Sequence, residues 1–120
     1  MPLLDPLVVA LGDPAGIGPE VTAKAWLACR DLDDCPPFLA VGDARAIEAV
    51  WDGPVERIYD PSEAARVFPT ALPIIQVEDA GDIRPGHPDF EGARCSLDSL
   101  ELAVGLARSG AVGGLVTGPV

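Results

Sequence analysis

Basic residues are scarce in this sequence. Eight Lys and Arg stand against 19 Asp and Glu, which gives a formal net charge of -11, and Lys24 is the only lysine. Because an acidic protein repels polyanions, we expect no nucleic-acid partner. A small phosphorylated ligand stays compatible with this charge, since a local site can be positive where the whole molecule is not.

Histidine and cysteine are also few, which limits the metal and redox chemistry available. His87 is the only histidine, and it stands between Gly86 and Pro88 without a companion ligand at a useful spacing. We interpret it as a solvated loop residue rather than as a metal ligand. The three cysteines have no C-x-x-C spacing, so they indicate reduced thiols and neither a disulfide framework nor a zinc ribbon.

Long hydrophobic runs are absent as well. The apolar run at residues 7–11 is too short for a signal peptide or a membrane span, and no basic segment precedes it. We therefore expect a cytoplasmic protein with no membrane partner. Its 120 residues, 48% of them hydrophobic, suffice for one small globular unit.

A loop rich in glycine and proline is the most informative segment. Residues 12–20 read Gly-Asp-Pro-Ala-Gly-Ile-Gly-Pro-Glu, between a strand-like run at 7–11 and a helix-like segment at 21–29. Glycines let a backbone approach a ligand closely, and the first N–H groups of a helix can hold an anion. The glycine spacing fits neither the dinucleotide fingerprint nor the Walker loop. The segment predicts a ligand loop of another kind.

Three polar residues of this sequence, two in the loop and one near the end of the chain, have two interpretations each. Asp13 either contacts a ligand or forms an Asx turn around Pro14. Glu20 either lies at the site or interacts favourably with the dipole of the helix that Pro19 starts. Thr117 either offers a hydroxyl to a ligand or bonds its own turn.

The alternation of apolar runs and helix-like segments predicts an α/β protein with a partial mixed or parallel sheet and flanking helices. Further strands are expected at 38–41, 55–59, 72–77 and 115–117, and further helices at 44–51 and 93–109. Asp43 is expected to cap a helix, with a role at the site as the alternative, and residues 60–63 form a box-like cap.

The last helix and strand carry three packing expectations. Helical spacing of four apolar residues predicts a core-facing stripe at Leu97, Leu100, Val104 and Ala107. Gly105 suggests a close helix contact, and 115–117 is expected to be a buried strand. Since ligands collect at the carboxyl ends of strands in open α/β sheets, we expect Thr117 and the Asp13 loop to line one crevice.

Two segments carry a family resemblance. Residues 12–20 match the signature G-[DE]-P-A-G-I-G-P-[DE] at every position, and residues 114–120 resemble a strand and turn ending V-T-[GA]-P-[IV]. Such segments are typical of the 4-hydroxythreonine-4-phosphate dehydrogenase family of vitamin B6 biosynthesis. The resemblance implies that residues 1–120 are the N-terminal α/β segment of a longer dehydrogenase, with the remainder absent. It also implies the N-terminal part of an isocitrate/isopropylmalate dehydrogenase-like fold.

In that family the full enzyme oxidises 4-hydroxythreonine 4-phosphate, a small phosphorylated amino acid, with decarboxylation to an amino ketone phosphate. The resemblance implies NAD or NADP, a homodimer, and a divalent metal (zinc, magnesium or cobalt) whose ligands are expected beyond Val120. It places near substrate or cofactor the residues Gly12, Asp13, Gly16, Gly18, Glu20 and Thr117. No catalytic or metal-binding residue is carried over.

Two other functions are left open by the sequence. A paralogue of the same family would act on a dihydrodiol dicarboxylate. A truncated, inactive fragment would serve only as a packing or binding module. The isolated chain is expected to be inactive in either case, and to self-associate through exposed apolar surface.

Overall fold

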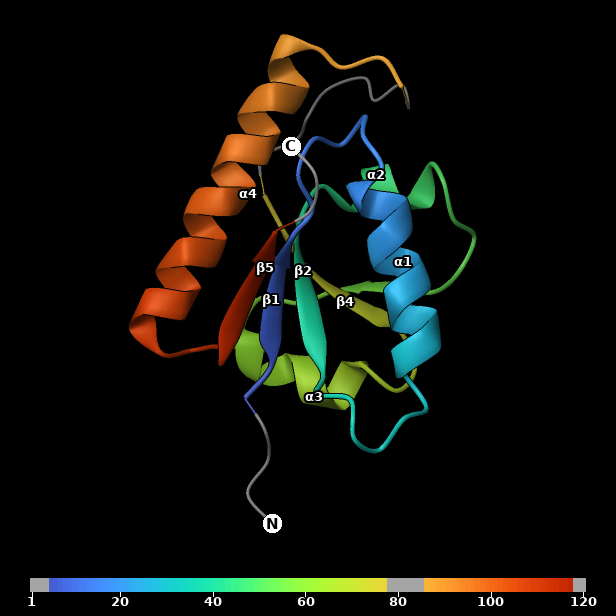
Figure 1. The fold of residues 1–120 in the computed structure, drawn as a ribbon, viewed down its shortest axis with the longest axis vertical. Coiled ribbons are helices and arrows are strands. Elements are labelled where there is room, and N and C mark those ends of the chain that lie inside the picture. Colours follow the sequence, from blue (N-terminus) through green and yellow to red (C-terminus); the bar gives the residue numbers. More distant parts are fainter. Residues whose placement is uncertain (1–4, 78–85, 118–120) are drawn as a thin grey trace.

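A parallel five-stranded sheet forms the centre of the protein (Figure 1). The computed structural model describes residues 5–77 and 86–117. The strands are β1 (Leu7–Ala10), β2 (Phe38–Gly42), β3 (Val55–Arg57), β4 (Leu72–Gln76) and β5 (Gly114–Thr117). They lie in the order β3-β4-β2-β1-β5, and all four neighbouring pairs run parallel. The predicted α/β class is confirmed.

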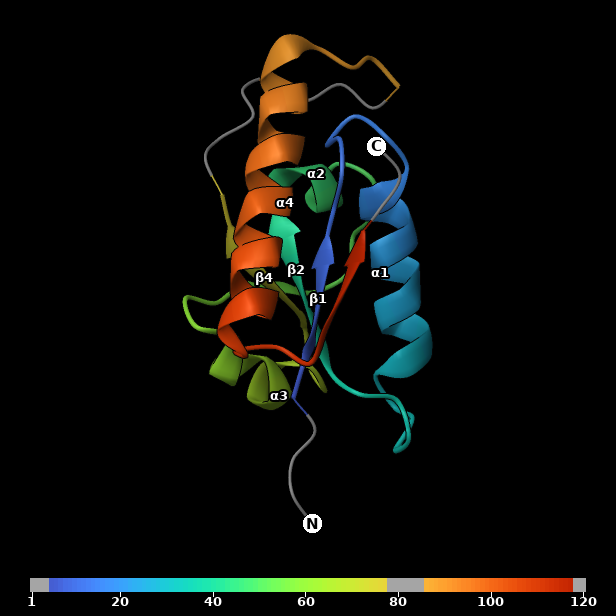
Figure 2. The ribbon, with the colours of Figure 1, turned by 60° about the vertical axis from the view of Figure 1, so that its left-hand side comes forward.

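Helices cover both faces of this sheet. They are α1 (Gly18–Cys29), α2 (Ala44–Glu48), α3 (Ala64–Val67), which follows a 3-10 turn at Pro61–Glu63, and α4 (Phe90–Ser109). Helices α1 and α4 lie on opposite sides of the strands (Figure 2). Within the described ranges, no helix is long and apolar enough to cross a membrane.

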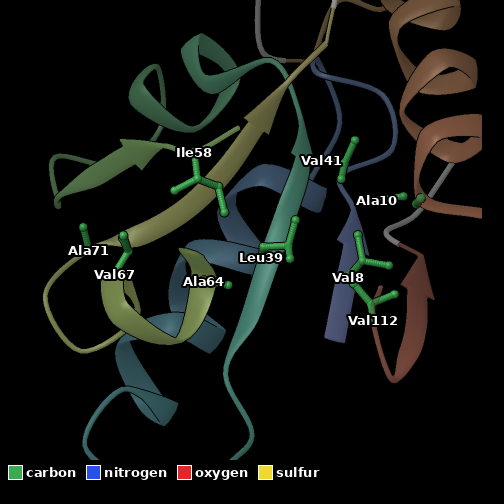
Figure 3. Close-up of a cluster of buried hydrophobic side chains, with 10 residues drawn as sticks. Val8, Ala10, Leu39, Val41, Ile58, Ala64, Val67, Ala71 and Val112 are labelled. Carbon is green, nitrogen blue, oxygen red and sulfur yellow. The ribbon is translucent and has the colours of Figure 1, made fainter. Parts of the chain in front are cut away.

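Side-chain alternation along the central strands builds a separate core on each face. The α4-side core, shown in Figure 3, joins the sheet to α3 and α4; it contains Val8, Ala10, Leu39, Val41, Ile58, Ala64, Val67, Ala71, Ala103 and Val112. The α1-side core joins the sheet to α1 and α2; it contains Leu11, Ala23, Trp26, Phe38, Ala40, Ala44, Ile47, Phe68, Leu72 and Ile74. All of these residues are buried, so the sheet is a shared wall between two cores.

The helix boundaries differ from those predicted by a few residues. Helix α1 begins at Gly18 rather than at residue 21, since Pro19 suits the first turn. Helix α4 begins at Phe90 rather than at 93, because the Asp89 carboxylate accepts a hydrogen bond from Gly92 N at 2.7 Å and caps it. Helix α2 ends at Glu48, one turn before the predicted end.

The predicted core stripe of α4 is wrong in its first half. Leu97 and Leu100 are 59% and 37% exposed. The buried side of α4 instead carries small residues, namely Gly92, Cys95, Ser99 and Ala103. Small side chains let the helix lie close to the sheet, which displaces the longer leucines to its flanks.

Two further packing expectations are also wrong. An added Cβ at Gly105 would have no neighbour within 4 Å, so no close contact explains this glycine. Strand β5 is not buried, because it is an edge strand; Leu115 is 36% and Val116 49% exposed.

Candidate functional site

The carboxyl ends of β1 and β5 lie beside the amino-terminal half of α4 (Figure 1). A cavity of about 580 Å³ lies between these elements. One wall comes from β1, its following loop and β5, through Ala10, Gly12, Asp13 and Thr117. The other wall comes from α4, through Ala93, Ser96, Leu97 and Leu100. Residues of both matched segments therefore meet in one crevice, at the edge of an open α/β sheet where ligands collect.

The turn that leaves β1 depends on Gly12. Its φ of 79° lies in the left-handed region, which glycine adopts without strain. Gly12 directly follows Leu11, whose side chain is fully buried, so this turn leads the chain from the end of β1 along the cavity.

Asp13 shapes the loop from within. Its Oδ1 accepts a hydrogen bond from Ala15 N at 2.8 Å, and its backbone carbonyl accepts one from Gly16 N at 2.9 Å. The Asx-turn interpretation is thus confirmed. The loop also packs against the start of α4, since a Cβ added at Gly92 would lie 3.2 Å from Asp13 Oδ1. Asp13 lines the cavity as well, so ligand contact stays a prediction.

The remaining predicted residues of the loop lie outside this cavity. Gly16 is exposed, and Gly18 begins α1 and lines a different hollow. Glu20 lies on the solvent side of α1, where its Oε1 is 3.1 Å from Lys24 Nζ. An exposed i, i+4 ion pair of this kind stabilises a helix by only about 0.3–0.5 kcal/mol. The position of Glu20 agrees with the helix-dipole interpretation.

The second hollow, which we call the α1–β5 groove, lies between α1, β1 and β5 and has a volume of about 270 Å³. Its lining is almost entirely apolar, and includes Leu7, Val9, Val21, Phe38 and Val116. Thr117 lines this groove and the cavity alike. The end of β5 therefore separates two open surfaces.

Asp43, at the carboxyl end of β2, is a buried structural carboxylate. Its Oδ1 accepts hydrogen bonds from Arg45 N at 3.0 Å and from Gln76 Nε2 at 3.1 Å, and its Oδ2 lies 2.8 Å from Arg45 NH2. Gln76 in turn accepts a hydrogen bond from Ala44 N at 2.9 Å. The predicted cap of α2 is confirmed, and it ties β4 to the start of that helix.

The wall contributed by α4 was missed by sequence reasoning. Leu97 and Leu100 were assigned to the core, and Ser96 was given no role. Only the placement of α4 beside β1 and β5 brings these residues to the cavity, and this placement depends on contacts between segments about 80 residues apart. Ser96 adds a hydroxyl to a wall that is otherwise apolar.

A metal centre does not fit the residues that the structure describes. His87 is exposed, and within residues 5–77 and 86–117 no three His, Cys, Asp or Glu side chains gather as metal ligands would. A dinucleotide is also not held by a recognisable fingerprint loop here. The cavity therefore offers a wall for a bound molecule rather than a complete cofactor site.

Comparison with known proteins connects this geometry to a family. The chain is 45% identical over 117 residues to the 4-hydroxythreonine-4-phosphate dehydrogenase of Zymomonas mobilis, an alignment that covers 98% of the chain. It is 43% identical over 116 residues to the enzyme of the same name from Caulobacter vibrioides, covering 96% of the chain. Over nearly its whole length, the chain is similar in sequence to the 4-hydroxythreonine-4-phosphate dehydrogenase family. No family model matches the chain.

Solved structures give the same result for the fold. A 4-hydroxythreonine-4-phosphate dehydrogenase from Burkholderia phymatum superposes with a TM-score of 0.81 at 27% identity, over 97% of this chain and 36% of that one. A terephthalate 1,2-cis-dihydrodiol dehydrogenase from Burkholderia xenovorans has a TM-score of 0.69 at 24% identity, over 93% and 33% of the two chains. The second likeness concerns the fold alone.

The match covers nearly all of this chain but only part of each 4-hydroxythreonine-4-phosphate dehydrogenase. The chain spans 35% of the length of the Zymomonas relative and 34% of that of the Caulobacter relative. The described site therefore corresponds to only one part of these relatives.

Proposed function

We propose that this chain is part of a dehydrogenase that oxidises 4-hydroxythreonine 4-phosphate, with decarboxylation, in pyridoxal phosphate biosynthesis. The observation that carries the proposal is the 45% identity over 98% of the chain to an enzyme of that name. The meeting of both signature segments at one cavity supports it. The paralogue acting on a dihydrodiol dicarboxylate has only a likeness of fold in its favour.

The proposed cofactors are NAD or NADP and a divalent metal. A nicotinamide cofactor supplies the hydride acceptor that an alcohol oxidation requires. The metal ligands are expected outside the described residues, and the full enzyme is expected to be a homodimer. Here the role of the chain is to form one wall of the substrate or cofactor pocket, through Asp13, Ser96 and Thr117.

The test is an assay of the full-length protein with 4-hydroxythreonine 4-phosphate, NAD or NADP, and a divalent metal, following reduced nicotinamide. Activity with this substrate, and none with a dihydrodiol dicarboxylate, is the expected result. The reverse preference would assign the paralogue function. The isolated 120-residue chain is expected to show no turnover under the same conditions.

The role of Asp13 is separated from its turn by Asp13→Asn. Asparagine keeps the acceptor for Ala15 N, so the loop should hold its shape while the charge disappears. Losing a charge-assisted contact of about 1.5–3 kcal/mol would lower kcat/KM roughly 10- to 100-fold. Glu101→Gln on the exposed side of α4 is the matched control and should leave it unchanged. If Asp13→Asn keeps the wild-type kcat/KM, Asp13 does not contact the ligand through its charge and serves only to form the turn.

A further inference from the structure

Two of the three thiols meet at the carboxyl end of α1. Cys29 is the last residue of this helix, and its carbonyl accepts a hydrogen bond from Leu32 N at 3.0 Å. The Leu32 carbonyl then accepts one from Cys35 N at 3.3 Å. These two successive turns bring the chain back to the helix end, where Cys29 is a neighbour that acts on the thiol of Cys35.

The surroundings of this pair leave it open to small reagents. Both cysteines are only half-buried, and residues 30–34 between them are all exposed. Cys29 ends α1 and Cys35 lies in the loop that leads into β2. This end of α1 is opposite the end that follows the Asp13 loop (Figure 1). The chemistry of the pair is therefore independent of the proposed dehydrogenase activity.

Cys35 holds its proton firmly. The hydrogen bond to Cys29, followed by desolvation and the charge of nearby Asp34, raises the pKa of Cys35 to about 11. Cys35 consequently remains a thiol at neutral pH, and thiolate is the reactive form of cysteine. Cys35 is therefore suited to the second step of an oxidation, as the resolving thiol.

We propose that Cys29 and Cys35 form an oxidation site that closes a reversible disulfide across the end of α1. With hydrogen peroxide as oxidant, the sulfur of Cys29 attacks one peroxide oxygen, the O–O bond breaks, and water leaves a sulfenic acid. The sulfur of Cys35 then attacks Cys29, the S–O bond breaks, and a second water leaves. Two thiols lose two protons and two electrons, and one peroxide takes them up to become two waters.

Cys95 does not share this chemistry. It lies on the buried side of α4, and burial raises the pKa of its thiol to about 11. The hydroxyl of Ser99, which is also buried, donates a hydrogen bond to the Cys95 carbonyl at 2.7 Å. Cys95 is therefore a control thiol within the same chain.

The test treats the native full-length protein with a stoichiometric amount of hydrogen peroxide, blocks remaining thiols, and maps peptides without reduction. Trypsin cleaves after Lys24, Arg30 and Arg45, so the disulfide joins residues 25–30 to residues 31–45. We expect this linked pair, lighter than its two parts by two hydrogens, and its disappearance after dithiothreitol. Cys95→Ser should form the same link.

Two variants test the order of the steps. In Cys35→Ser, a sulfenic acid on Cys29 should persist and react with dimedone, because no resolving thiol remains. In Cys29→Ser, neither the link nor dimedone labelling of Cys35 should appear. The proposal is overturned if the native protein gives no linked pair, or if the link involves Cys95 instead. A link that forms only after the protein is unfolded in urea would overturn it as well.

Discussion

Gly12 has the tightest conformational requirement among the residues that line the cavity. Its left-handed φ of 79° carries the chain from a buried strand into the ligand loop. A residue with a Cβ would be sterically strained at the same φ. The glycine is required by backbone geometry, whatever the ligand is.

Gly12→Ala should lower the free energy of unfolding by about 1–2 kcal/mol, the typical cost of a left-handed residue with a Cβ. Urea unfolding followed by circular dichroism measures this change. Gly105→Ala is the matched control, since Gly105 lies within α4 with open space around it. That variant should gain about 0.5–1 kcal/mol instead. Equal effects in the two variants would contradict the conformational argument.

At the scale of elements, the cap of the 3-10 turn that precedes α3 shows how local sequence specifies structure. Asp60 Oδ1 accepts from Ser62 N at 2.9 Å, and Glu63 Oε2 accepts from Tyr59 N at 2.9 Å and from Asp60 N at 3.0 Å. This capping box was predicted from four consecutive residues and is confirmed. It needs no information from the rest of the chain.

The capping box should make stability depend on acid pH. Its hydrogen bond to Ser62 lowers the pKa of Asp60, and the hydrogen bonds to Tyr59 and Asp60 lower the pKa of Glu63. As pH falls, the unfolded chain binds these protons first. The stabilisation is therefore complete above the ordinary carboxyl pKa values and is lost as pH falls through the lowered folded values.

The measurement is the urea midpoint between about pH 6 and pH 2, a range that spans the ordinary carboxyl pKa values. Glu63→Gln keeps an acceptor oxygen for the cap but cannot titrate, so its midpoint should fall less steeply than that of the wild type. Glu101→Gln, outside the box, serves as the control. Parallel profiles for wild type and Glu63→Gln would show that the box makes no contribution to the pH dependence.

The same elements show where prediction from sequence stops. The strands, the Asp43 cap and the meeting of Gly12, Asp13 and Thr117 followed from local patterns and from the rule for parallel sheets. The inner face of α4 did not, because a stripe of small residues has weaker hydrophobic periodicity than the flanking leucines. Only tertiary packing decides between two such faces of one helix, and the cavity wall was missed for that reason.

At the scale of the whole molecule, β5 and the α1–β5 groove leave apolar surface open. Val116 is 49% exposed on an edge strand, and it lines the groove together with Val21 and Phe38. Edge strands with exposed apolar side chains are prone to pair with other chains.

The isolated 120-residue chain should therefore self-associate. Sedimentation velocity over a range of concentrations is the measurement, and species larger than the 12.4 kDa monomer are expected. Val116→Lys places a charge on the edge and should shift the distribution toward monomer. Glu91→Lys, at an exposed position of α4, is a charge-changing control that should leave the distribution unchanged. A wild-type chain that is monomeric at every concentration contradicts the prediction.

The two tryptophans give the molecule an uneven spectroscopic signature. Trp26 donates its indole N–H to the Phe68 carbonyl at 2.8 Å, and its ring lies edge-on to Trp51 with centroids 5.6 Å apart. Both rings belong to the layer of α1 and α2, and no tryptophan occurs elsewhere in the sequence. Fluorescence thus reports the opening of one side of the sheet, while detachment of α4 is silent in emission and visible only as lost helical ellipticity.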